Sequence, residues 1–192
     1  TADMCLPDGI GVVIASRILG DPLPERTTGF DFMMKLINMA EKQGLSLFLL
    51  GGKPGVAQKA ADKIKAMFPG VNIAGTHHGY FKNEGEYNIL NIINDKSPDI
   101  LLVAMGFPKQ EKFMIKNKNK LKFRVAIGVG GSFDVLSGDV SRAPVFMQRA
   151  GLEWLYRLIT QPWRFKRMTV LPLFLIKAII HRLFSGKIKS NS

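Results

Sequence analysis

Residues that could do chemistry stand near both ends of this chain of 192 residues and in its middle. Pro7-Asp8-Gly9 is typical of a turn that begins a helix, and a carboxylate there could act as a general base. Near the other end, the guanidinium groups of Arg157, Arg164 and Arg167 are suited to gripping a diphosphate. The alternative for Asp8 is an ordinary turn residue, and the alternative for the three arginines is that they are solvated surface charges. The sequence of these segments alone does not decide between the two interpretations.

In the middle of the chain, polar residues follow a fully apolar segment. Residues 100–105 are apolar without alternation, which is typical of a strand covered on both faces by helices. A turn at Gly106 follows, and the polar residues Lys109, Gln110 and Glu111 then open a helix. Because open α/β sheets bind ligands beyond the carboxyl ends of their strands, this turn is the first candidate for a site.

Two glycine-rich turns follow other expected strands. Gly51-Gly52 could offer backbone amides to a phosphate, but the spacing matches no Walker or dinucleotide motif, and an ordinary turn explains it better. Gly130-Gly131 would let the backbone approach a ligand, while Phe133 could stack on a base and Asp134 could accept from a base or ribose. A tight turn with a capping aspartate is the alternative.

The metal-ligating residue types do not form a site. His77 and His78 are neighbours, and neighbouring side chains of an extended chain point to opposite sides, so they do not readily share one ion. The single cysteine, Cys5, excludes an internal disulfide and indicates a reducing compartment. The first residues also lack the pattern of a signal peptide. We therefore expect a cytoplasmic protein with no metal and no cofactor.

Strands, glycine-rich turns and helices alternate at short intervals, as in βαβ units. This pattern predicts an α/β fold, with a Rossmann-like, largely parallel sheet and helices on both faces. The expected strands cover residues 45–50, 71–74, 100–105 and 123–129. The expected helices cover residues 10–19, 29–43, 56–68, 84–95 and 110–119.

The carboxyl-terminal part differs in composition from the rest. Nine basic residues lie from Val145 onward against one acid, Glu153, so this part supplies +8 of the net charge of +12. Helices are expected over residues 152–160 and 163–184, the second bent at Pro172, with the bases on one half of the helix and apolar residues on the other. Its apolar run is too short to span a bilayer, which needs about 20 residues.

We therefore divide the chain into a core, residues 1–144, and a helical appendage, residues 145–192, that binds the surface of an anionic membrane. A helix docked on its own domain or on a twin subunit is the alternative, so a homo-oligomer stays open.

Taken in order, these segments resemble the TagA/WecG/CpsF family of bacterial glycosyltransferases over nearly the whole chain, and the long tail resembles the TagA branch. The segments that carry the resemblance are Pro7-Asp8-Gly9, Leu23-Pro24-Glu25-Arg26 with Gly29, Gly51-Gly52, Gly106-Phe107-Pro108-Lys109-Gln110-Glu111, Gly130-Gly131-Ser132-Phe133-Asp134, Gly138, Arg142-Ala143-Pro144, and Gly151-Leu152-Glu153-Trp154-Leu155-Tyr156-Arg157 through Pro162 to Arg164 and Arg167.

The resemblance implies transfer of N-acetylmannosamine from its UDP donor to the 4-hydroxyl of GlcNAc on undecaprenyl diphosphate, in the linkage unit of wall teichoic acid. It implies inversion, no metal, and work at the inner face of the bacterial membrane. The roles that it implies are Asp8 as general base, Arg26 and Gln110 in the sugar and acceptor pocket, Asp134 with its glycine turn on the uridine, and Arg157, Arg164 and Arg167 on the diphosphate.

One departure and two alternatives accompany the resemblance. The family carries a further amino-terminal segment with a Thr-Pro-Asn motif that nothing here matches. Either the chain is a fragment, and we then expect the sheet to lack strands, or it is a divergent member of the family. The donor could be another UDP-sugar, such as UDP-N-acetylmannosaminuronic acid or UDP-glucose. From another class, a non-catalytic basic module could bind anionic lipid or nucleic acid, and aromatics such as Trp154 could stack on bases. Apolar residues such as Ile179 suit lipid better, so we expect no nucleic acid.

Overall fold

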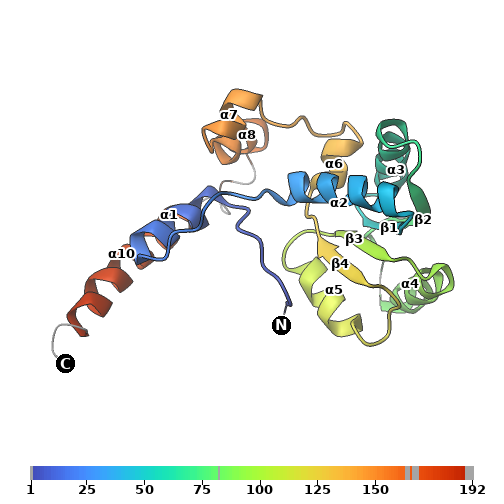
Figure 1. The fold of residues 1–192 in the computed structure, drawn as a ribbon, viewed down its shortest axis with the longest axis horizontal. Helices are drawn as coiled ribbons and strands as arrows, with labels where there is room; N and C mark the ends of the chain where they lie inside the picture. Colours follow the sequence, from blue (N-terminus) through green and yellow to red (C-terminus); the bar gives the residue numbers. More distant parts are fainter. Residues whose placement is uncertain (1, 82, 163–164, 166–168, 189–192) are drawn as a thin grey trace. The chain divides into compact units, whose positions relative to one another are not determined.

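The computed structural model describes residues 2–81, 83–162, 165 and 169–188 (Figure 1). The contacts between residues divide the chain into two compact units. The sheet unit is Gly29–Ser141, and the helical unit combines Ala2–Thr28 with Arg142–Ser192. The boundary predicted at residue 144 lies close to the second junction, whereas residues 2–28 group with the helical unit rather than with the core. The division of the chain into a core and an appendage as separate domains stays a prediction.

The sheet unit contains a parallel sheet of 4 strands in the order β2-β1-β3-β4. The strands are β1 (Ser46–Gly51), β2 (Asn72–His77), β3 (Ile100–Ala104) and β4 (Val125–Gly128). The central strands β1 and β3 pair in register, with Leu49 opposite Leu102. The predicted parallel α/β fold is confirmed.

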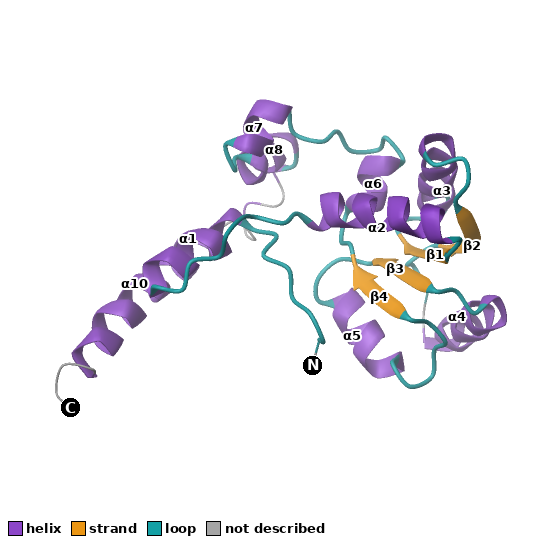
Figure 2. Cartoon of the chain, in the orientation of Figure 1, coloured by secondary structure: helices purple, strands orange, loops and turns teal. Residues whose placement is uncertain are grey.

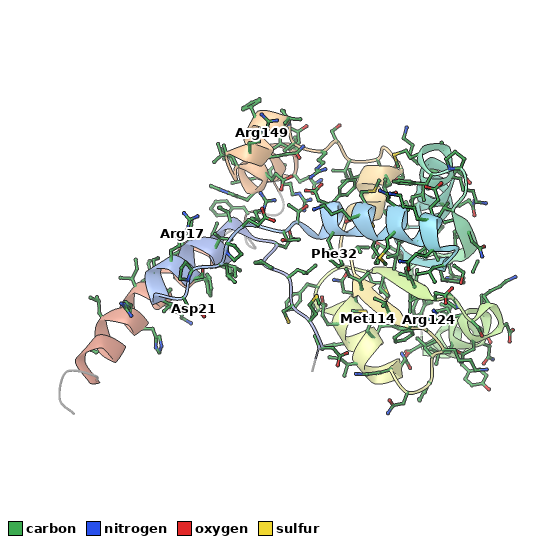
Figure 3. The ribbon with its side chains drawn as sticks, viewed as in Figure 1. Arg17, Asp21, Phe32, Met114, Arg124 and Arg149 are labelled. Carbon is green, nitrogen blue, oxygen red and sulfur yellow. The ribbon has the colours of Figure 1, made fainter. Side chains whose placement is uncertain are left out.

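Helices cover both faces of this sheet (Figure 2). Successive side chains of a strand point to opposite faces, so Leu47 and Leu49 pack with one set of helices, and Phe48 and Leu50 with the other. The first set is α2 (Gly29–Gln43), α3 (Val56–Met67) and α6 (Ser132–Leu136); the second is α4 (Asn83–Lys96) and α5 (Lys109–Asn117). Phe32 and Met114, labelled in Figure 3, belong to the two opposite layers.

The amino ends of three strands are held together by Asp99. Its Oδ2 accepts from the Ser46 amide at 2.8 Å and from the Ser46 hydroxyl at 2.9 Å, and its Oδ1 lies 3.0 Å from Nε of Arg124 (labelled in Figure 3). The hydrogen bonds from the Ser46 backbone and side chain, followed by the charge of Arg124, lower the pKa of Asp99. The charged form of Asp99 therefore stabilises the starts of β1, β3 and β4.

This arrangement predicts a pH-dependent effect of Asp99→Asn. Because the pKa of Asp99 in the folded state lies below its ordinary value of 3.8, its contribution is present above that value and is lost as the pH falls through the lower folded pKa. We expect the variant to unfold at a lower urea concentration than the wild type at neutral pH, and the difference to shrink in acid. Asp95→Asn, at an exposed position of α4, is the control. A difference that is independent of pH would contradict the role of the charge.

The helical unit contains α1 (Ile10–Leu19), α7 (Val145–Arg149), α8 (Glu153–Thr160) and α10 (Val170–Ile188). Helices α1 and α10 pack along each other, α1 in blue and α10 in red in Figure 1. Gly11 permits the close approach, because a Cβ there would overlap Leu171. Farther along, Ala178 is buried and Arg182 Nη1 donates to the Leu19 carbonyl at 3.3 Å, near the end of α1.

One prediction about the appendage is modified by the structure. The predicted bend at Pro172 is wrong: α10 begins at Val170, so Pro172 lies in its first turn, where a missing N–H breaks no helical hydrogen bond. Most of the residues expected to lead into this helix, 163–164 and 166–168, lie outside the described residues. None of the described helices has a segment long and apolar enough to span a bilayer.

Candidate active site

The carboxyl ends of the four strands form the candidate ligand edge of the sheet unit, called the carboxyl edge here. The chain runs from β1 outward to β2, and then returns to β3 and β4 on the other side of β1. The loops after β1 and β3 therefore diverge at the point where open α/β sheets bind ligands. Gly51-Gly52 and Gly106, predicted from the sequence, both lie at this point.

Gly51 and Gly52 bring the loops of this edge close together. Gly51 has a φ of 146°, and a Cβ there would overlap the carbonyl of Ala104 at the end of β3. The Gly52 amide donates to that carbonyl at 2.9 Å, and the Gly52 carbonyl accepts from the Gly79 amide at 2.9 Å. Because the Gly52 amide already has a partner, this geometry supports close packing of the loops and not the phosphate cradle proposed for that amide.

Gln110 connects helix α5 to the loop after β4. Its side-chain oxygen accepts from the Gly130 amide at 3.0 Å, and its Nε2 donates to Glu111 Oε1 at 2.8 Å. The residue is only 6% exposed and lies over Gly128, where a Cβ would overlap the Gln110 amide. This position supports a role for Gln110 in holding the Gly130 turn, whereas Lys109, the preceding residue, is exposed to solvent.

Glu111 belongs to the polar segment that the sequence analysis expected at this edge of the sheet, but no specific role was assigned to it. Its Oε1 accepts from Gln110, whereas its Oε2 is buried and has no hydrogen-bond partner in the part of the chain that the structure describes. A buried carboxylate oxygen without a donor is unfavourable, so a donor from a ligand would stabilise it. Its place directly after Gln110, in the first turn of α5, is the signal that could have indicated such a role.

The glycine turn after β4 leads directly into a short helix, which was not among the predicted helices. Helix α6 begins at Ser132, and Phe133 is fully buried in the core between the sheet, α2 and α3. The predicted stacking of Phe133 on a base is therefore not possible in this structure. Asp134 lies half-buried in the first turn of α6, with its Oδ2 near Gly131, and stays a candidate for the nucleotide.

In the helical unit, Asp8 and Arg26 are neighbours. Asp8 is exposed just before α1, and its backbone carbonyl accepts from Arg26 Nε at 2.7 Å. The Thr27 amide donates to the Pro7 carbonyl at 3.1 Å, so the two segments run beside each other. The structure thus brings together two of the three predicted catalytic residues, Asp8 and Arg26. The third, Gln110, belongs to the sheet unit.

Helix α8 adds a carboxylate to this pair. Glu153, in the first turn of α8, forms an ion pair with Arg26 Nη2, and its other oxygen lies 3.7 Å from Arg142 Nε. The side chains of Arg26 and Glu153 are 16% and 15% exposed. The sequence analysis did not assign a role to Glu153 or Arg142. The available signal was that Glu153 is the single acid from residue 145 onward.

The arginines predicted to hold a diphosphate are described in part. Arg157 is exposed on α8, one turn after Glu153 and therefore on the same side of that helix. Arg164 and Arg167 lie outside the described residues. Arg157 and the pair of Asp8 and Arg26 thus belong to one unit, while the glycine turns belong to the other.

The histidines of the loop after β2 have local partners. His77 Nδ1 lies 2.8 Å from the His78 carbonyl, and His78 Nδ1 accepts from the Tyr80 amide at 3.2 Å. Within the described residues, no three His, Cys, Asp or Glu side chains are grouped to hold a metal ion. These contacts assign both rings to the loop's own structure.

The fold and the candidate site describe an α/β protein with a candidate ligand edge at its strand ends and a carboxylate–guanidinium cluster in a second unit. Comparison with known families specifies the class: the chain belongs to the glycosyl transferase WecG/TagA/CpsF family, whose model matches residues 1–188.

Three relatives that are similar to this chain over most of its length carry the same name. The chain is 41% identical over 187 residues to a protein of Bacillus spizizenii, covering 97% of this chain and 72% of the relative. It is 40% identical to a protein of Bacillus subtilis, covering 93% and 69%, and 35% identical to one of Staphylococcus aureus, covering 92% and 68%. Each of these relatives is named N-acetylglucosaminyldiphosphoundecaprenol N-acetyl-beta-D-mannosaminyltransferase.

Proposed function

We propose that this chain is an inverting glycosyltransferase of the membrane surface, which moves N-acetylmannosamine from UDP-N-acetylmannosamine to the 4-hydroxyl of GlcNAc on undecaprenyl diphosphate. The observation that carries the proposal is the 41% identity, over 97% of the chain, with a relative named N-acetylglucosaminyldiphosphoundecaprenol N-acetyl-beta-D-mannosaminyltransferase. The product would be the linkage unit of wall teichoic acid.

Asp8 is the proposed general base. An inverting transfer needs one group that takes the proton of the acceptor hydroxyl as its oxygen forms a bond to the anomeric carbon. The bond from that carbon to UDP breaks in the same step, and UDP leaves with the electron pair. Exposure of Asp8 to solvent, at a turn held by Arg26, supports access of a hydroxyl to its carboxylate.

Guanidinium groups are proposed to stabilise the diphosphate of the leaving UDP. The departing UDP gains negative charge on its diphosphate, and arginines can neutralise that charge in the transition state. Arg157 stands on the same side of α8 as Glu153, which contacts Arg26. This arrangement supports delivery of positive charge by α8, and we extend the role to Arg164 and Arg167 from their spacing in the sequence.

The donor nucleotide is proposed to bind at the carboxyl edge of the sheet unit. Gly106 and Gly130, both with positive φ, Gly131, Asp134 and Lys109 lie there, and Gln110 holds the Gly130 turn. The buried Glu111 Oε2 is an acceptor suited to a sugar hydroxyl. Phe133 and the Gly52 amide have no part in this proposal, because the first is buried in the core and the second has a backbone partner.

We place the enzyme at the inner face of the cell membrane, because its acceptor carries a lipid that stays in the bilayer. Leu173, Ile176, Ile180 and Leu183 are exposed and lie on one face of α10. That face is opposite the one that holds Ala178 against α1, since a helix turns about 100° per residue. An apolar helix face flanked by bases such as Lys177 suits an anionic membrane.

This surface predicts a measurable loss of membrane binding. Replacing both Ile176 and Ile180 with glutamate is expected to weaken binding to phosphatidylglycerol vesicles by about 10- to 100-fold, because buried apolar area is replaced by charge. Vesicle co-sedimentation gives the partition constant. The matched control replaces Val145 and Phe146, exposed on α7, with glutamate. Equal losses in the two variants would show that added negative charge alone weakens binding.

The proposed function is tested by turnover with a panel of UDP-sugars and a short polyprenyl-diphosphate GlcNAc acceptor. We expect UDP release and disaccharide formation with UDP-N-acetylmannosamine, and a β linkage in the product. A preference for UDP-N-acetylmannosaminuronic acid or UDP-glucose would agree with the family but would show that the proposed donor is wrong. No transfer from any of these donors, together with salt-dependent binding of single-stranded DNA, would favour a non-catalytic basic module.

A further inference from the structure

The ion pair between Arg26 and Glu153 joins two segments that the proposed reaction needs together. We propose that Glu153 is a positioning residue: its carboxylate holds the Arg26 guanidinium, and through it the Asp8 turn, in the orientation required for transfer. This inference rests on the function proposed above, because it takes Arg26 and Asp8 as members of the catalytic machinery.

The first step of the argument is the double engagement of Arg26. Its Nε donates to the Asp8 carbonyl at 2.7 Å, and its Nη2 pairs with Glu153. A guanidinium is planar and rigid, so two fixed nitrogens determine the orientation of the third, Nη1. With Nε alone engaged, a single hydrogen bond to Asp8 would hold the guanidinium, so its plane could rotate and that bond could open to solvent. Glu153 is therefore the contact that determines where the remaining donors of Arg26 point.

The second step is the backbone around this contact. The Thr27 amide donates to the Pro7 carbonyl, which keeps the segment of Arg26 beside the Asp8 turn. Gly151 has a φ of 71°, and a Cβ there would lie only 3.0 Å from Ile10 at the start of α1. The turn before α8 is thus packed against the turn that presents Asp8. Glu153 follows Gly151 by two residues and is positioned by this packing.

The third step is charge. Glu153 is the single acid from residue 145 onward, among nine bases. It pairs with Arg26, 127 residues away in the chain, and its other oxygen lies near Arg142. Both Arg26 and Glu153 are mostly buried, so removing the carboxylate would leave the guanidinium without a counter-charge in a partly desolvated place. Arg26 would then reorient toward solvent.

The test compares Glu153→Gln, which keeps the shape and removes the charge, with Glu25→Gln. Glu25 is exposed in the same unit and is one residue from Arg26 in the chain. Initial rates with UDP-N-acetylmannosamine and the GlcNAc acceptor give kcat and KM, and calorimetry gives the affinity for UDP. The NMR signal of the Arg26 Nε–H reports how strongly this donor is protected from exchange with solvent.

We expect Glu153→Gln to lower kcat by roughly 10- to 100-fold, the cost of misplacing a catalytic group, with UDP affinity within about twofold of the wild type. Exchange of the Arg26 Nε–H should rise by about tenfold. In an Arg26→Ala background the same substitution should have little further effect on kcat, because Glu153 acts through Arg26. Glu25→Gln should match the wild type in every measurement.

Each contrary outcome has its own meaning. Unchanged exchange of the Arg26 Nε–H in Glu153→Gln would overturn the inference, even if the wild type transferred no N-acetylmannosamine. Faster exchange with an unchanged kcat would overturn the catalytic part of the inference. An equal loss of kcat in the presence and absence of the Arg26 side chain would show that Glu153 acts by another route. A wild type without transfer activity would overturn the proposed function itself.

Discussion

Asp8→Asn is expected to lower kcat for transfer by about 10²- to 10⁴-fold, the range that a positioned general base contributes. Asparagine has nearly the shape of aspartate but cannot take up the proton of the acceptor hydroxyl at neutral pH. The Asp8 backbone carbonyl that accepts from Arg26 remains in the variant, so the turn should keep its place. Initial rates at saturating donor and acceptor measure the effect, and calorimetry with UDP checks that the nucleotide still binds.

Asp21→Asn is the matched control for this substitution. Asp21, labelled in Figure 3, is an exposed aspartate that follows α1 in the same unit. Its replacement should leave both kcat and UDP affinity unchanged. If Asp8→Asn turned over acceptor as fast as the control, another group would have to take the proton.

The second large effect is expected in stability. Phe48→Ala should lower the free energy of unfolding by about 3–5 kcal/mol, because it leaves a cavity under a central strand. Phe48 is fully buried in β1, and its ring packs close to Gly75 of the adjacent strand β2. Urea denaturation followed by circular dichroism measures the change.

Tyr87→Ala is the control for the loss of a large aromatic side chain. Tyr87 is 69% exposed on α4, and exposed positions change stability by about 0.5 kcal/mol or less. Similar losses in the two variants would contradict the assignment of Phe48 to the core.

The fold could be predicted because its signals are local. The uninterrupted apolar residues of β1 and β3 and the glycines that end them indicate strands buried on both faces, and both strands lie where they were expected. Helix α1 begins and ends at the predicted residues. Helix α6 was not among the expected helices, because Gly130-Gly131-Ser132 is typical of a turn. The apolar spacing of Phe133 and Leu136, which packs this short helix on the core, was the weaker signal.

The site could be predicted only in part, because its contacts join distant residues. Asp8 and Arg26 were selected and lie together. The partner of Arg26 is Glu153, 127 residues later, and no pattern within either segment indicates that contact. Gln110 was selected as a pocket residue, but its burial under the Gly130 turn depends on the space left by Gly128, which becomes evident only in three dimensions.

The most direct test of the central claim is a crystal structure of the protein with UDP and a GlcNAc-diphosphate acceptor analogue. The account predicts uridine at the carboxyl edge of the sheet unit, beside Asp134, and the acceptor 4-hydroxyl within about 2.6–3.2 Å of an Asp8 carboxylate oxygen. Arg157 should face the diphosphate. An acceptor bound away from Asp8, with UDP on a surface remote from the glycine turns, would contradict it.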